Sequence, residues 1–299
     1  MELILTLDVG TTSVKACLFD RQLRQTALTS REYALQTRGV CAEAEAQVYL
    51  DAAAQCILSL PAEARARVCA VALTTQGETL LCVDRQGKAL RPAIVWLDSR
   101  AEAQAARLAA ALDRQRFYER TGLPELSGAL PLAKLLWLRE QEPESWARTD
   151  KFLLLEDYLM LWLTGRAVTE KSLLTSTGYF DLQSDDYWDE ALALAELDRT
   201  RLPQALACGS IVGPVLPEVA EALGLPASAC VVTGAMDQTA AALAAGCTRP
   251  GTLCETTGTA MVAAAFTAHP QFSEDHHVTI YRHAMPGAYL YLPIRTPSA

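Results

Sequence analysis

The chain has 299 residues, of which 51% are hydrophobic and 20% are charged, and its formal net charge is −9 at pH 7. This composition predicts a globular protein with a large core. The acidic balance and the lack of a Lys/Arg-rich run argue against a nucleic-acid or anionic-membrane surface and favour a small-molecule partner. We expect a cytoplasmic protein, because the amino end has no basic signal segment and no apolar run is long enough for a bilayer.

Two apolar segments at the amino end flank a small polar turn. Residues 2–8 and 13–20 have the pattern of strands, and the turn Val9-Gly10-Thr11-Thr12 joins them into a predicted hairpin, with a third strand at 25–35. The hairpin tip offers backbone N–H groups, hydroxyl groups, the carboxylate of Asp8 and the cation of Lys15, which together can hold a phosphate. The spacing Gly-x-Gly-x-x-Gly is absent from this segment, which argues against a dinucleotide-binding fold.

Residues 42–60 are rich in alanine and leucine and predict the first helix, which Pro61 closes. Residues 67–74 predict a buried strand, and the polar run 75–79 follows it. Ligands of α/β sheets bind at the carboxyl ends of such strands, so we expect ligand contacts here. Further along, Trp96 can equally be a core residue or the wall of a pocket.

Four more helices are predicted at 99–112, 132–140, 186–197 and 217–223, and residues 151–164 predict a strand that passes into a helix. The polar segments 169–172 and 175–178 are interpreted as a solvated connection, the common place for such a composition.

Asp237 begins a predicted helix that follows a short buried strand, residues 230–233, and a turn at Gly234. One interpretation is that a carboxylate at this position caps the helix and has no other role. The small polar turns at 8–13 and 256–259 favour a functional role instead, because three such turns then surround one acid. The strand, Gly-Thr turn and strand from Thr252 onward repeat the pattern of the opening hairpin.

Five segments, in this order, resemble motifs of the FGGY family of carbohydrate kinases. They are Leu7-Asp8-Val9-Gly10-Thr11-Thr12-Ser13, Thr75-Gln76-Gly77-Glu78-Thr79, Trp96-Leu97-Asp98-Ser99-Arg100, Gly234-Ala235-Met236-Asp237-Gln238 and Thr257-Gly258-Thr259. The resemblance covers the whole chain and implies an α/β, actin-like (ribonuclease-H-like) fold with a mixed sheet flanked by helices. It implies a sugar-binding N-terminal domain at 1–246, which carries the catalytic base, and the first strands of a truncated nucleotide-binding domain at 247–299.

The resemblance also implies that ATP, with Mg²⁺, phosphorylates a hydroxyl group of a sugar, sugar acid or polyol. Asp237 would be the general base, and Asp8 would hold the metal directly or through water. The phosphate groups would lie against Asp8, Gly10, Thr11, Thr12, Ser13, Lys15, Gly258 and Thr259. The residues expected to contact the sugar are Gln76, Gly77, Glu78, Trp96, Asp98, Asp237 and Gln238.

The substrate signature departs from those of two branches of the family. Glycerol kinases carry Arg-Glu and xylulose kinases carry Met-His at the place of Gly77-Glu78. The small Gly77 is expected to leave room for a substrate bulkier than glycerol, so a pentulose, a hexulose or a sugar acid is favoured.

Length is the other departure, because family members continue with a second domain about as large as the first. We therefore expect the 299-residue chain to be inactive as a kinase by itself. We also expect residues after Gly246 to expose apolar faces, and so to be mobile or to pair with another molecule as a homodimer. Two alternatives stay open, a noncatalytic sugar-binding or assembly module and an acetate-kinase-like or hexokinase-like phosphotransferase.

Overall fold

A six-stranded mixed sheet organises the amino-terminal part of the computed structural model, which describes residues 2–257, 261–275 and 277–295. The strand order is β14-β15-β6-β1-β2-β3. The strands β1, β6 and β15 are parallel, whereas β2, β3 and β14 run antiparallel to their neighbours. Their bounds are β1 Leu3–Val9, β2 Ser13–Phe19, β3 Gln25–Glu32, β6 Val68–Thr75, β14 Ile211–Pro214 and β15 Cys230–Met236. The hairpin expected at the amino end is confirmed.

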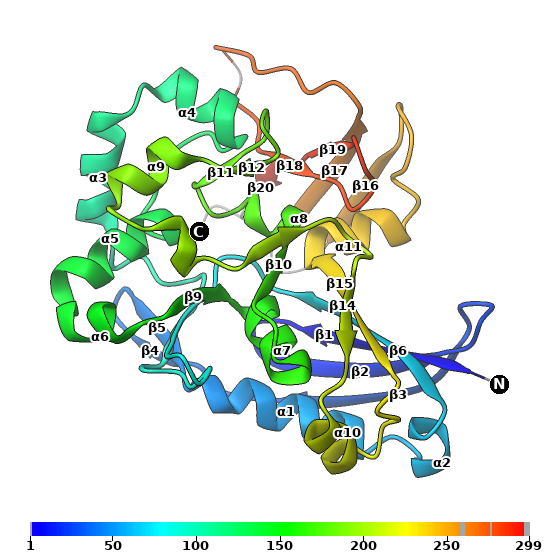
Figure 1. The fold of residues 1–299 in the computed structure, drawn as a ribbon. Coiled ribbons are helices and arrows are strands. Elements are labelled where there is room, and N and C mark those ends of the chain that lie inside the picture. Colours follow the sequence, from blue (N-terminus) through cyan, green and yellow to red (C-terminus); the bar gives the residue numbers. More distant parts are fainter. Residues whose placement is uncertain (1, 258–260, 276, 296–299) are drawn as a thin grey trace.

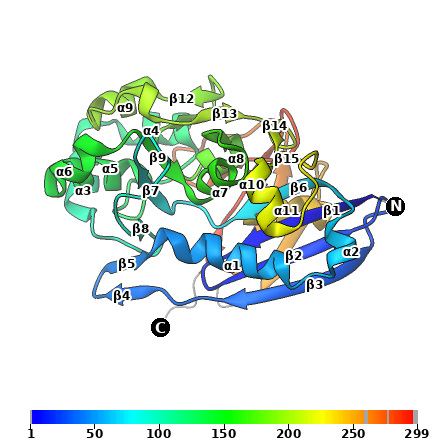
Figure 2. The same cartoon turned by 60° about the horizontal axis from the view of Figure 1, so that its bottom comes forward.

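One face of this sheet is buried beneath helices. Alternate residues of β1, among them Leu5 and Leu7, are fully buried, as the period of two in a strand requires. They share a hydrophobic core with the helices α1, α7 and α10. Helix α1 lies below β2 in Figure 1 and runs alongside β2 and β3 in Figure 2. The bounds of these helices are α1 Ala46–Leu58, α7 Leu155–Thr164 and α10 Pro217–Leu223, and the short α2 spans Ala62–Arg65.

The helix expected at 42–60 begins later than predicted. Residues Cys41–Ala44 form the strand β5, which alternates between half-buried and buried positions and pairs with β4 and β8. Pairing with distant strands thus overrides the helix propensity of this alanine-rich segment. The small sheet that contains β5 consists of β4 Gln36–Arg38, β5, β8 Ala93–Ile94, β7 Leu80–Val83 and β9 Lys151–Leu154. The expected passage from strand to helix at 151–164 is confirmed by β9 and α7.

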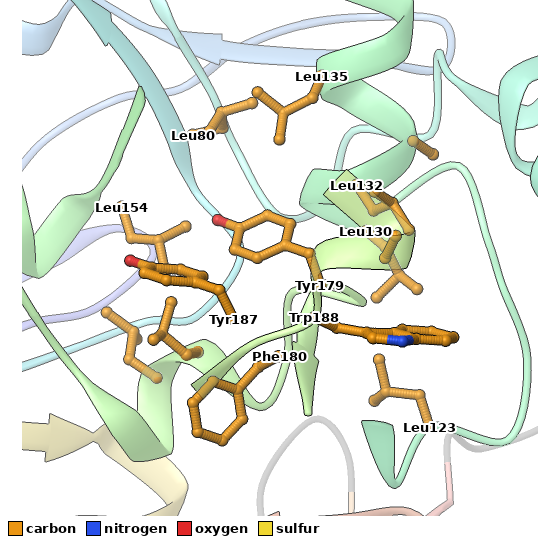
Figure 3. Packing of buried hydrophobic residues seen from close by; sticks show 14 of the residues in the cluster. Leu80, Leu123, Leu130, Leu132, Leu135, Leu154, Tyr179, Phe180, Tyr187 and Trp188 are labelled. Atoms are coloured by element: carbon orange, nitrogen blue, oxygen red, sulfur yellow. The ribbon is translucent and has the colours of Figure 1, made fainter. Parts of the chain in front are cut away.

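A second core holds the helical part together, and Figure 3 shows part of it around Tyr179, Tyr187 and Trp188. Its helices are α3 Glu102–Ala111, α4 Arg114–Thr121, α5 Pro131–Gln141, α6 Pro143–Arg148 and α9 Asp189–Leu194. The prediction of a helix at 186–197 is wrong for the first turn, because β12 (Asp186–Tyr187) pairs with β11 (Phe180–Asp181) before α9 begins. This pairing places the Tyr187 and Trp188 rings in the core.

The solvated connection expected at 169–178 is wrong. This segment forms β10 (Val168–Glu170) and α8 (Lys171–Leu174), followed by a buried turn. The hydroxyl groups of Thr175, Ser176 and Thr177 donate hydrogen bonds to the carbonyl oxygens of α8, three residues earlier in each case. Because each hydroxyl finds a local acceptor, the polar run can be buried.

The carboxyl-terminal residues form an antiparallel sheet that packs on the helical part (Figure 1). Its strands are β16 Leu253–Thr257, β17 Met261–Thr267, β18 Ile280–Arg282, β19 Tyr289–Tyr291 and β20 Ile294–Arg295. Ile280 and Leu290 are fully buried in the same core as α4 and α5, and the Ile280 N–H donates to the Gly122 carbonyl oxygen at 2.8 Å. The expected exposure of apolar faces after Gly246 is therefore wrong for this sheet, although Leu253 stays 66% exposed.

The other elements are η1 Arg199–Arg201, β13 Gln204–Leu206 and α11 Asp237–Ala244. Among the helices that the described ranges contain, none has the length and apolar character needed to cross a membrane.

Candidate active site

The carboxyl ends of three parallel strands meet at one edge of the main sheet. Val9 of β1 pairs with Thr75 of β6, and Thr75 pairs with Met236 of β15. The Gln76 N–H extends this register by donating to the Val9 carbonyl oxygen at 3.0 Å. Segments that are far apart in sequence, namely 10–13, 76–79 and 237–238, therefore leave the sheet side by side. This edge is where ligands of α/β sheets bind.

Asp237 is the first residue of α11 and is half-buried beside its neighbour Gln238. Burial raises the pKa of the Asp237 carboxyl to about 6, and the negative charge of Asp8 adds to this effect, while the Gln238 N–H opposes it. That N–H donates to Oδ1 of Asp237 at 2.6 Å. The residue at the capping position is Met236, so Asp237 does not cap the helix through its side chain in the usual way. A carboxylate of this kind is ionised at pH 7 and can accept a proton.

The hairpin tip between β1 and β2 is held from outside by two aromatic side chains. The Tyr33 hydroxyl donates to the Gly10 carbonyl oxygen, and Nε1 of Trp96 donates to Oγ1 of Thr11 at 2.9 Å. Inside the turn, the Gly10 N–H donates to the Ser13 carbonyl oxygen at 3.0 Å. Within the described residues, the N–H groups of Thr11 and Thr12 have no acceptor, which leaves two donors at a fixed tip for an anion.

Asp8 and Lys15 lie opposite each other on β1 and β2, with 3.3 Å between Nζ and Oδ2. Both side chains are about half exposed, and Asp8 lies close enough to Asp237 for its charge to act on that carboxyl. In the part of the chain that the structure describes, no group of three or more His, Cys, Asp or Glu side chains could hold a metal ion. Mg²⁺ at phosphate sites takes one or two carboxylates and completes its shell with phosphate oxygens and water, so Asp8 alone fits that requirement. Gly258 and Thr259 lie outside the described residues.

Gln76 places a buried side-chain amide in the segment that leaves this edge of the sheet. Its side chain is 3% exposed, and its amide makes no hydrogen bond of good geometry among the described residues. The buried Tyr49 hydroxyl, likewise without a partner, lies close enough for Gln76 to lower the Tyr49 pKa, against the larger raising effect of burial. The Oγ1 of Thr79 is buried without a partner in the same turn. Buried polar atoms in proteins are almost always hydrogen-bonded, so the polar atoms of this turn are candidates for ligand contact.

The space beside Gly77 is occupied, in contrast to what its small size predicts. A Cβ atom at this position would lie 3.1 Å from Oγ of Ser176 and 3.3 Å from Sδ of Met236. The room expected for a bulkier substrate is therefore filled by these two side chains.

Glu78 is half-buried and has a left-handed backbone, with φ of +53°. Such a conformation costs energy in a residue other than glycine and is common at functional sites. Burial raises the pKa of Glu78 to about 7. The charge of Lys134 and the nearby Ser176 hydroxyl oppose this effect, and the charge of Asp237 reinforces it. Lys134 is fully buried, its Nζ donates to the Val95 carbonyl oxygen at 2.9 Å, and burial lowers its pKa to about 8 against the attraction of Glu78.

Trp96 is 37% exposed and lies against the hairpin tip, which favours the pocket-wall interpretation over the core. Asp98 is different, because its side chain is completely buried and bonded within the protein. It accepts the Ala42 N–H at 2.7 Å and binds the Arg100 guanidinium through both oxygens. The structure thus does not bring Asp98 to the site surface, and we correct its expected sugar contact to a role in holding the loop.

Three residues near Glu78 escaped the sequence analysis. Lys134 could have been noticed as a single charge inside an apolar run, since such a charge is rarely buried without a purpose. Ser176 belongs to the polar segment that was interpreted as solvated. Tyr281 of β18 is buried close enough to Glu78 and Asp237 for their charges to raise its pKa further above its usual value, beyond the larger effect of burial. No local signal in the sequence marks Tyr281.

Residues 3–244 match the model of the FGGY family of carbohydrate kinases, N-terminal domain. The chain is 30% identical to the xylulose kinase of Lactococcus lactis subsp. lactis over 96% of this chain and 58% of that protein. It is 26% identical to the gluconokinase of Bacillus subtilis over 93% of this chain and 54% of that protein. It thus spans somewhat more than half the length of these relatives.

The structure of xylulose kinase from Rhodospirillum rubrum has the same fold, with a TM-score of 0.92 and 29% identity over 98% of this chain and 60% of that one. The sequence motifs imply an actin-like fold with a mixed sheet flanked by helices, as in these kinases. The structure and its similarity to these kinases confirm this prediction. The chain belongs to the FGGY family of carbohydrate kinases.

Proposed function

We propose that this chain supplies the sugar-binding half and the catalytic base of an ATP-dependent carbohydrate kinase. The observation that carries the proposal is the position of Asp237, which follows Met236 at the end of β15 as Gln76 follows its partner Thr75 at the end of β6. Burial raises the pKa of the Asp237 carboxyl to about 6. We propose residues 1–246 as the sugar-binding domain and 247–299 as the first strands of a nucleotide-binding domain.

The chemistry requires one proton acceptor and a site for phosphate charge. A sugar hydroxyl has a pKa far above neutrality, so a carboxylate within hydrogen-bond reach that takes its proton during phosphoryl transfer is sufficient. Asp237 would take this proton. The N–H groups of Thr11 and Thr12, with Lys15 and Ser13, would face the phosphate groups of ATP. Mg²⁺ bound at Asp8 would neutralise charge on the transferring group.

The sugar would lie between Gln76, Glu78 and Trp96. The amide of Gln76 has one acceptor and two donors to offer, and a carboxylate such as Glu78 accepts hydrogen bonds from vicinal hydroxyl groups. The similarity to a xylulose kinase and a gluconokinase supports a pentulose, a hexulose or a sugar acid as substrate.

Titration calorimetry of the 299-residue chain with a panel of ketoses, polyols and sugar acids tests the proposal. One sugar should bind, and Gln76→Met should weaken its binding about tenfold or more, the scale of a lost buried hydrogen bond. Gln86→Met, in an exposed hairpin turn away from the site, is the matched control and should bind as the wild type does. If no member of the panel binds, the proposed function is contradicted. If Gln76→Met binds as tightly as the wild type, Gln76 is not part of the sugar site.

The second candidate is noncatalytic sugar binding by these 299 residues, which span 58% and 54% of the length of two relatives. Phosphoryl transfer depends on positioning two substrates together, so we expect the chain by itself to bind sugar without turnover. A coupled assay of ADP release with the sugar panel should stay at background. Sugar-dependent ADP release by the purified chain would contradict this expectation. Dimerisation remains a prediction that size-exclusion chromatography with light scattering can check.

A further inference from the structure

The strand that delivers Asp237 is irregular just before this residue. The pairing of β15 with β6 shifts register between Val232 and Ala235, so Thr233 and Gly234 have no regular partner on β6. A Cβ at Gly234 would lie 1.3 Å from the Leu73 carbonyl oxygen, so the two backbones are in direct contact here. Such an irregularity re-aims the end of a strand.

The other edge of β15 also loses its partner at this point. The strand β14 pairs with Cys230, Val231 and Val232, and the Thr233 N–H still reaches the Ser210 carbonyl oxygen at 2.9 Å. Beyond Thr233, no strand of the described residues pairs with this edge of β15. Buried backbone N–H groups need acceptors, so side chains must replace the missing strand.

Two buried side chains take over this role. Oε1 of Glu156 accepts the Gly234 N–H at 3.0 Å, and Oγ of Ser172 accepts the Met236 N–H at 3.2 Å. The Ser172 hydroxyl donates in turn to Oε2 of Glu170, which also accepts the Ser172 N–H at 2.8 Å and the Leu173 N–H at 3.2 Å. Because the Ser172 hydroxyl hydrogen is bonded to Glu170, the Ser172 oxygen is left as an acceptor for the Met236 N–H.

We propose that Ser172, oriented by Glu170, is a positioning residue that sets the place of the Asp237 carboxylate relative to the sugar site. The inference rests on the proposed function, in which Asp237 is the base. Ser172 is fully buried and makes no hydrogen bond to Asp237, so its effect on this carboxylate is indirect. It acts through the N–H of Met236, the last residue before Asp237, and Glu156 supports the same strand two residues earlier.

The burial of this arrangement explains why a hydroxyl and a carboxyl are needed together. Ser172 is fully buried and Glu170 is 1% exposed, so water is not available to replace either partner. An unpaired Met236 N–H would then be costly, and the chain would shift to find another acceptor. A shift of this kind moves Asp237 directly, because the two residues are adjacent.

The test uses Ser172→Ala, and also Ser172→Cys, which keeps a side chain of similar size with only a weak acceptor. Both variants should speed hydrogen exchange of the Met236 amide about fivefold or more, the scale of one lost hydrogen bond. Carboxyl NMR should show that the midpoint of the Asp237 titration changes. Thr177→Val is the matched control, since it removes a buried hydroxyl from the same segment that donates to the Leu174 carbonyl oxygen and accepts the Tyr179 N–H at 3.3 Å, with no hydrogen bond to β15.

Sugar affinity completes the measurement. Ser172→Cys should bind the sugar at least several-fold more weakly than Thr177→Val does. If the exchange of the Met236 amide, the Asp237 titration and the sugar affinity all match those of Thr177→Val, Ser172 is merely structural and the inference is overturned. The first two readouts need no sugar, so a wild-type chain that binds none would contradict the proposed function and leave the positioning test readable.

Discussion

Asp157 gives a sharp test of the buried acids behind the candidate site. Its side chain is completely buried at the start of α7, where Oδ2 accepts the Leu154 N–H at 2.7 Å and Oδ1 has no partner. Burial raises the pKa of Asp157 to about 8, and the charge of Glu170 adds to it, while the Leu154 N–H and Thr169 oppose it. The carboxyl is thus protonated in the folded state at neutral pH.

The sign of the pH dependence follows from the raised pKa. An unfolded Asp has a pKa of about 3.9, so above that value the unfolded chain loses a proton that the folded chain keeps. The free energy of unfolding therefore falls as pH rises towards the folded pKa, by about 1.4 kcal/mol for each pH unit. Asp157→Asn removes this term and keeps an oxygen to accept the Leu154 N–H. The variant should gain about 2 to 3 kcal/mol on the wild type between about pH 5.5 and pH 7.5.

Urea unfolding, followed by tryptophan fluorescence at several pH values, measures this difference. The neighbouring Glu156 and Glu170 are present in both proteins, so their own titrations largely cancel. Asp198→Asn is the control: the N–H and hydroxyl of Thr200 lower the pKa of that exposed carboxyl, and its variant should differ from the wild type by a constant amount. A difference for Asp157→Asn that does not grow with pH would refute a protonated, buried Asp157.

Three further predictions concern the site itself. Gly234→Ala should prevent folding, because its Cβ would collide with the Leu73 carbonyl oxygen. Gly10→Ala should fold, because the nearest atom to its Cβ is 3.7 Å away. Circular dichroism and the yield of monodisperse protein distinguish the two variants. Glu78→Ala and Trp96→Ala should each weaken sugar binding by about 1 to 3 kcal/mol in calorimetry, and unchanged affinity in both would remove them from the site. In a fusion of this chain to the part of the Lactococcus lactis relative that it does not cover, Asp237→Asn should lower turnover about a hundredfold or more, with sugar affinity nearly intact. Turnover within a few-fold of the unmodified fusion would exclude Asp237 as the base.

The sequence by itself determined the local elements of the site. The opening hairpin follows from two apolar strands around Gly10, and the start of α11 at Asp237 follows from the strand, glycine turn and alanine-rich helix around it. These features depend on neighbours in the chain, whose propensities and periodicity can be read directly. The order of the five motifs then indicated the family.

Only the tertiary structure decided which residues share an environment. The pairing of Val9, Thr75 and Met236 brings the three motifs to one edge. Other tertiary contacts bury Asp98 against Arg100 and place Ser176 beside Gly77. The pairs Glu78–Lys134 and Ser172–Met236 join residues that are more than fifty positions apart. Burial and charge coupling depend on distances between such residues, and a linear pattern of residue types does not contain those distances.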